Sequence, residues 1–79
     1  MDPIYPAGVK SQVIRIHAEA RPFKPFFIEL SSGTRIRVAH PEDIMMRNGW
    51  IVVWRAGLPH IFEASDAVQL YRAAARRAP

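Results

Sequence analysis

The segment that most constrains the fold is residues 21–33, which read RPFKPFFIELSSG. Pro22 and Pro25 each fix their own φ near about −65° and disfavour the helical region at the residue before them. A helix therefore cannot run through residues 21–25. After Pro25 the residues alternate, with apolar side chains at Phe26, Ile28 and Leu30, and this period of two is typical of a half-buried β-strand.

A turn and a second strand follow directly. Ser32 and Gly33 are turn residues, and glycine tolerates the positive φ that a tight chain reversal requires. Residues 34–38 then alternate again, with Ile36 and Val38 on one side and arginines on the other. Residues 26–38 are therefore predicted to form a β-hairpin.

Further short strands are predicted after this hairpin. Residues 41–43 are expected to form a single turn, followed by a strand over residues 44–47. Asn48-Gly49 is the sequence typical of a two-residue type I′ turn, in which both residues have positive φ. A strand over residues 50–54, a turn over residues 56–59 and a strand over residues 60–63 complete this series.

The strand WIVVW, residues 50–54, is apolar at every position. Such a strand is either covered on both faces or exposes one face to a partner. Because a short chain has little material with which to cover both faces, the pattern favours an oligomer interface. Alternate residues share a face of a strand, so the candidate interface consists of Trp50, Val52 and Trp54.

The two ends of the chain allow more than one interpretation. Residues 9–20 carry apolar residues at helical spacing (Val9, Val13, Ile16 and Ala20), and Ser11 lies where a helix over residues 10–19 would begin, but strand-like alternation is present as well. Residues 64–76 fit either a helix that begins at Ser65-Asp66 or a turn followed by a last strand. We expect residues 1–9 to be a flexible leader, residues 10–73 a single domain and residues 74–79 a basic tail.

Length and composition limit the classes of protein to which this chain can belong. Seventy-nine residues, 49% of them hydrophobic, suit one small globular domain. There is no cysteine, no apolar run long enough to cross a membrane and no signal peptide. We therefore expect a cytoplasmic protein without membrane association.

Few residues in the sequence are of the types that carry out catalysis. His17, His40 and His60 are far apart, and only His40 lies near acidic residues, Glu42 and Asp43. A histidine at a strand end beside a turn explains that cluster without a metal ion, and the serines occur in turn or cap positions. We expect no enzyme activity, no metal site and no cofactor.

The net charge of +4 comes mainly from arginine, which supplies nine of the eleven basic residues. Arginine suits bidentate contacts to phosphate or carboxylate groups. The candidate nucleic-acid-binding residues are four arginines expected to line one sheet face, with Phe27 or Trp54 as a stacking platform for bases: Arg35, Arg37, Arg47 and Arg55. The alternative is that these arginines form an ordinary solvated face.

Residues 20–42 resemble a family of short bacterial proteins to which no activity is assigned, with the motif A-x-PF-x-PF-x-I-x-L-x-x-G followed by V-x-HP-[ED]. The matching residues are Ala20, Pro22-Phe23, Pro25-Phe26, Ile28, Leu30, Gly33, Val38 and His40-Pro41-Glu42. The resemblance extends more loosely to about Tyr71, with Asp66 as a shared acid. It implies a helix at residues 10–19, and a turn and strand rather than a helix after Asp66.

The predicted fold is mainly β, of the α+β class. A helix precedes about five short antiparallel strands, an order similar to Sm-like or SH3-like small barrels and here expected to form a partial barrel. The expected function is a binding or interaction module that self-associates or meets a protein partner. The alternative is a small barrel that binds nucleic acid through an arginine-rich face.

Overall fold

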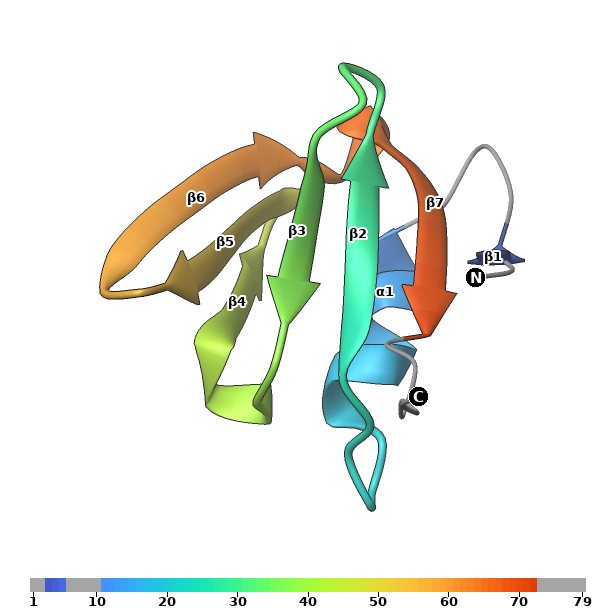
Figure 1. The fold of residues 1–79 in the computed structure, drawn as a ribbon, viewed down its shortest axis with the longest axis vertical. Helices are drawn as coiled ribbons and strands as arrows, with labels where there is room; N and C mark the ends of the chain where they lie inside the picture. Colours follow the sequence, from blue (N-terminus) through green and yellow to red (C-terminus); the bar gives the residue numbers. More distant parts are fainter. Residues whose placement is uncertain (1–2, 6–10, 73–79) are drawn as a thin grey trace, which may run out of the picture.

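The computed structural model describes residues 3–5 and 11–72, which form one helix and seven strands (Figure 1). The helix, α1, covers Ser11–Glu19, and two single 3-10 turns cover Pro41–Asp43 (η1) and Ala64–Asp66 (η2). The strands are β1 (Pro3–Tyr5), β2 (Phe26–Leu30), β3 (Arg35–Val38), β4 (Ile44–Arg47), β5 (Trp50–Arg55), β6 (Leu58–Glu63) and β7 (Ala67–Arg72).

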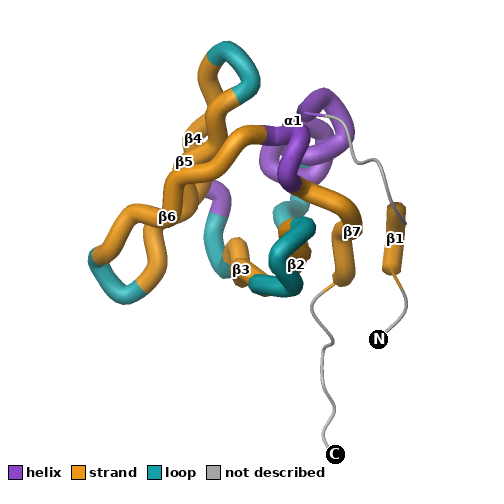
Figure 2. The backbone as a smooth tube through the Cα atoms, turned by 90° about the horizontal axis from the view of Figure 1, so that it is seen from above, coloured by secondary structure: helices purple, strands orange, loops and turns teal. Residues whose placement is uncertain are grey.

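The strands form two antiparallel sheets, and neither closes into a barrel. One sheet has the order β1-β7-β2-β3, and the other has the order β4-β5-β6. The turn η1 carries the chain from the first sheet to the second, and η2 carries it back (Figure 1). Seen from above, α1 lies against one face of the first sheet, beside the second (Figure 2). The prediction of a mainly β fold with one helix is confirmed.

The hairpin predicted over residues 26–38 is present as β2 and β3. Phe26 pairs with Val38 and Ile28 with Ile36, and all four side chains are buried. The amides of Leu30 and Gly33 close the turn with bonds of 2.8 Å to the carbonyls of Thr34 and Leu30, and Gly33 has a φ of 93°. Alternation therefore identified both the strands and their inward face correctly.

A single apolar core joins the two sheets and the helix. It contains one residue of α1, and the rest come from β2, β3, β5, β6, η2 and β7: Ile14, Phe26, Ile28, Ile36, Val38, Ile51, Val53, Phe62, Ala64, Ala67 and Leu70. Phe26 contacts the rings of His17 and Phe23, with centroid distances of 5.7 and 6.0 Å. Packing on Phe26 thus fixes α1 and the Pro-Phe segment against β2.

The helix predicted at residues 10–19 is confirmed as α1, and its predicted apolar face is correct at Val13, which packs against the core, but not at Ile16. Ile14 is the fully buried residue of α1, whereas Ile16 is 63% exposed. Val13 and His17 are half-buried, and the Nδ1 atom of His17 lies 3.0 Å from the carbonyl of Val13. The helix therefore turns Ile14, rather than Ile16, toward the buried cluster that contains Phe26.

Both hairpins of the second sheet have two-residue turns. Asn48 and Gly49 have φ of 50° and 82°, as expected for a type I′ turn. Ala56 and Gly57 also have positive φ, 52° and 79°, so β6 begins at Leu58 rather than at residue 60. The residues 58–59 that were predicted as a turn belong to the strand, because β6 is an edge strand and an edge tolerates Pro59.

Ala56 lies in a backbone region that suits glycine or asparagine, and its side chain is exposed. We expect Ala56→Asn to raise the free energy of unfolding by about 0.5–1 kcal/mol, because Asn-Gly is the preferred type I′ pair. Urea denaturation measures this change. Ala20→Asn is the control, because Ala20 is exposed with negative φ. If the Ala56→Asn variant is no more stable than the wild type, the positive φ of Ala56 does not strain the backbone.

The end of the domain is a turn and a strand. Residues 64–66 form η2, and β7 follows and pairs with β2, so the alternative of a helix over residues 65–72 is wrong. Residues 3–5, predicted as part of a flexible leader, form β1 against β7. The rest of the leader and the basic tail at residues 74–79 lie outside the described residues.

Candidate functional site

The central strand of the second sheet, β5, turns one face inward and the other outward. Ile51 and Val53 are fully buried against the core. Trp50 is 50% exposed, Trp54 is 41% exposed and Val52 between them is half-buried. The three residues predicted as an interface therefore share the side of the sheet that faces away from the core.

The register of the sheet adds residues from both neighbouring strands to this side. Met45 and Ile61 flank Val52 as its pairing partners on β4 and β6, and Pro59 pairs with Trp54. Met45 is 59% exposed and Ile61 is 64% exposed. We name this surface the tryptophan face and define it by six residues: Met45, Trp50, Val52, Trp54, Pro59 and Ile61. In Figure 2 no other element of the described chain crosses the side of this sheet that faces away from the first sheet.

Two opposite charges lie at one end of the tryptophan face. Arg47 on β4 and Glu63 on β6 are both paired with Trp50, one from each side, and both are exposed. No ion pair joins them within the described part of the chain. The face thus presents a cation on one edge and an anion on the other, in the same cross-strand row.

Met45, Pro59 and Ile61 were not predicted as part of this surface. A signal for Met45 was available, because a two-residue turn at residues 48–49 places Arg47 opposite Trp50 and hence Met45 opposite Val52. Pro59 and Ile61 were missed because the next turn was predicted to be two residues longer than it is. With the turn at Ala56-Gly57, the same count places Ile61 opposite Val52.

The four candidate arginines do not line one face. Arg35 on β3 is already engaged: its Nε atom lies 3.5 Å from the Oε1 atom of Glu29, and its guanidinium stacks over the Tyr71 ring at 4.9 Å. Burial, followed by the neighbouring Glu29 carboxylate, raises the pKa of the Tyr71 hydroxyl, which bonds to Gln69 at 3.0 Å. Arg47 lies on the tryptophan face, in the other sheet.

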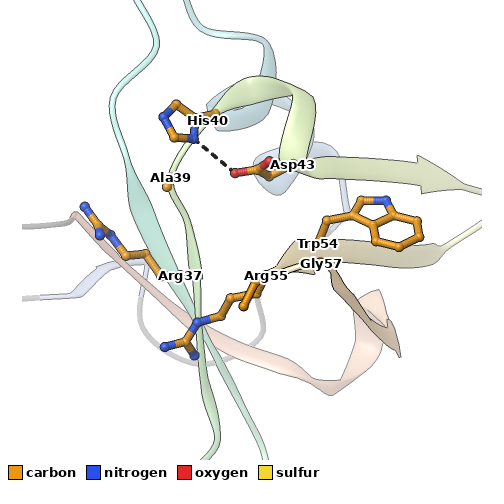
Figure 3. A pocket seen from close by; sticks show the side chains of 8 residues that line it. Arg37, Ala39, His40, Asp43, Trp54, Arg55 and Gly57 are labelled. Atoms are coloured by element: carbon orange, nitrogen blue, oxygen red, sulfur yellow. Dashed lines mark hydrogen bonds and ion pairs between the residues drawn. The ribbon is translucent and has the colours of Figure 1, made fainter.

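Arg37 and Arg55 do come together. Both line an open cleft of about 450 Å³ where the end of β3 meets the β5–β6 turn. We name it the arginine cleft; its lining residues are Arg37, Ala39, His40, Asp43, Trp54, Arg55, Ala56 and Gly57. In Figure 3 both arginine side chains lie on one side, and the Trp54 ring is turned the other way. Phe27, the other predicted stacking residue, is half-buried on β2, opposite Arg37 and Tyr71.

The remaining polar side chains form small clusters. His40 and Asp43 are 3.2 Å apart across η1. No group of three potential metal ligands occurs among residues 3–5 and 11–72. A second basic pocket beside the C-terminal end of α1 contains Arg21, Lys24 and Arg72. Cations are favoured there because the last carbonyls of a helix carry partial negative charge, and Arg21 donates to the Ala20 carbonyl at 2.7 Å.

Comparison with known proteins assigns this chain to no family. No protein-family model, curated protein or solved structure matches this chain. Within the described ranges, α1 is too short to cross a membrane, and no other helix is present that could.

Proposed function

We propose that this protein is a small interaction module that self-associates through the tryptophan face. The observation that supports it is the exposure of Met45, Trp50, Trp54 and Ile61 on one side of a three-stranded sheet. Contiguous apolar surface of this kind marks interaction sites, and tryptophan is enriched at the centres of interfaces. Burying this surface against a partner removes large apolar side chains from water.

The charges favour a second copy of this chain as the partner. A two-fold axis parallel to β5, between two facing sheets, places β4 of one protomer over β6 of the other. Arg47 then faces the partner's Glu63, and the partner's Arg47 faces Glu63. Met45 meets the partner's Ile61, and Val52 meets its own equivalent near the axis. The face is thus self-complementary, as an isologous interface requires.

The size of the face sets the strength of the association. Three strands about 4.8 Å apart, each contributing about five residues, cover a patch of roughly 14 by 17 Å. The area of this patch is well below the roughly 800 Å² that each partner of a stable complex buries. We therefore expect a reversible dimer with a dissociation constant on the order of 10–100 μM.

Sedimentation equilibrium over a dilution series tests the proposal. A molar mass that rises from one to two chains across the micromolar range is the expected result. Trp50 and Trp54 fluorescence, shifted to shorter wavelength as the concentration rises, reports burial of the face itself. A protein that stays monomeric up to about 1 mM contradicts the proposal, because the apolar face then has no affinity for itself.

A second candidate function, binding of single-stranded nucleic acid, is favoured by the presence of Arg37, Arg55 and Trp54 in the lining of one cleft. Paired guanidinium groups neutralise backbone phosphates, and an exposed tryptophan accepts stacked bases. Fluorescence anisotropy of labelled RNA and DNA over a salt series tests it. Affinity that falls steeply with salt supports this function, and equal affinity at low and physiological salt removes its electrostatic basis.

We also propose that the fold is a partly open relative of the Sm-like or SH3-like small barrels. Its support is the order of one helix and a meander of short strands, divided between two sheets that share one core. A cytoplasmic location fits the absence of cysteine from the sequence.

A further inference from the structure

We propose that the arginine cleft is a binding site for a phosphomonoester, a phosphate group that carries two negative charges and is attached to its carrier by one ester bond. This inference goes beyond self-association and does not depend on it. It narrows the second candidate function, because it assigns to the cleft a terminal phosphate rather than the internal phosphates of a nucleic-acid strand.

The charges of Arg37 and Arg55 are not neutralised within the described part of the chain. Ion pairs occupy Arg15, which contacts Glu19, and Arg35, which contacts Glu29. No such partner is present for Arg37 or Arg55, although both open onto the same cleft. Two guanidinium groups that share a cleft without a carboxylate between them are suited to bind an external anion.

Asp43 is the acidic residue that lines the cleft, and its carboxylate is already engaged. Its Oδ2 atom lies 3.2 Å from the Nδ1 atom of His40, and its side chain is 29% exposed. Figure 3 shows this contact on the side of the cleft away from the Arg55 guanidinium. Asp43 therefore lowers the positive potential of the cleft without pairing with either arginine.

The form of the cleft suits a phosphate attached to a larger group. The backbone at the Ala56-Gly57 turn forms one wall and Ala39 forms another, so both are small and leave the arginines accessible. The cleft holds about 450 Å³ and is open to solvent, which leaves room for the carrier beside the phosphate. The two side chains come from different sheets, and both extend to the same side of the cleft, with their guanidinium groups apart (Figure 3).

A monoester fits this pair of charges better than a diester does. The monoester has three terminal oxygens and a charge near −2 at neutral pH, which two arginines neutralise through paired N–H donors. A backbone diester has two terminal oxygens and a single charge. We therefore expect the cleft to prefer a terminal phosphate over an internal one.

Titration of ¹⁵N-labelled protein with phenyl phosphate, followed by NMR, tests the proposal. The amide signals of Ala39, Ala56 and Gly57 are expected to shift and saturate, and Arg37→Gln or Arg55→Gln to weaken binding at least tenfold. Arg35→Gln is the matched control, because it removes the same charge from the same strand and is expected to change affinity less than twofold. If Arg35→Gln and Arg37→Gln lose the same affinity for phenyl phosphate, binding arises from diffuse charge attraction, and the proposal is overturned.

A second substitution changes the affinity in the opposite direction. Asp43→Asn removes the negative charge that lines the cleft and is expected to tighten phenyl phosphate binding about threefold to tenfold. Glu42→Gln, an equal charge change at an exposed neighbour outside the lining, is expected to have a smaller effect. An Asp43→Asn variant that binds no more tightly than Glu42→Gln contradicts a local site.

Oligonucleotides distinguish the sources of the phosphate. A short single strand with a 5′-phosphate is expected to bind at least tenfold more tightly than the same strand with a 5′-hydroxyl. Equal binding of the two strands means that internal diesters carry the affinity, and it overturns the preference for a monoester. Repeating the titration at concentrations where sedimentation shows a monomer separates this result from the fate of the self-association proposal.

Discussion

Replacing Phe26 with alanine is expected to lower the free energy of unfolding by about 3–5 kcal/mol. Phe26 is 1% exposed and packs against the rings of His17 and Phe23, so it fastens α1 and the Pro-Phe segment to β2. A chain of 79 residues has a total stability of roughly 4–12 kcal/mol. The substitution therefore removes a large part of the stability and leaves a partly unfolded population at 37 °C.

Phe27→Ala is the matched control, with the same atoms deleted one position along the same strand. Phe27 points to the outer side of the first sheet and is half-buried, so we expect a loss of about 1 kcal/mol. Urea denaturation followed by far-UV circular dichroism measures both variants. If Phe27→Ala costs as much as Phe26→Ala, the assignment of the inward face of β2 is wrong.

The parts of the fold that were predictable depend on local chemistry. Prolines at 22 and 25, alternation after them and the turn at Gly33 define the first hairpin within thirteen residues. The Asn48-Gly49 turn likewise specifies its own positive φ values. Each of these features needs only neighbouring residues, so a sequence is sufficient to identify them.

The errors arose where packing between distant segments decides the outcome. In α1, Ile16 fits a helical face as well as Ile14 does, and only packing against the two sheets buries Ile14 and leaves Ile16 exposed. At the second turn, Pro59 suggested a break, but it lies in an edge strand where its missing N–H costs nothing. Neither choice is encoded within a short window of sequence.

The candidate sites likewise have a part that local sequence predicts and a part that depends on packing between distant segments. Period-two alternation was enough to place Trp50, Val52 and Trp54 on one side of β5, and exposure then showed that this side is open. The four arginines were grouped because they were expected to line one sheet face. Their separation depends on how the two sheets meet, and this brings Arg37 to Arg55 but leaves Arg35 and Arg47 elsewhere.

Val52→Lys is expected to weaken self-association at least 100-fold. Val52 lies at the middle of the tryptophan face, between Met45 and Ile61. In the proposed two-fold dimer each new ammonium group faces its equivalent across the axis, and like charges at a buried contact cost several kcal/mol. Sedimentation equilibrium is expected to show a monomer throughout the micromolar range. Ile16→Lys is the control, because Ile16 is an apolar residue with an exposed side chain on α1, away from this face.

Charge exchange at the end of the face then tests the orientation of the two protomers. Arg47→Glu alone, or Glu63→Arg alone, places two pairs of like charges opposite each other and is expected to weaken the dimer at least tenfold. The double variant Arg47→Glu/Glu63→Arg restores both pairs in reversed order, so its dissociation constant is expected to return to within about threefold of the wild type. If the double variant loses as much dimer affinity as the two single variants together, the axis is not parallel to β5. Arg47 and Glu63 then do not face each other across the interface.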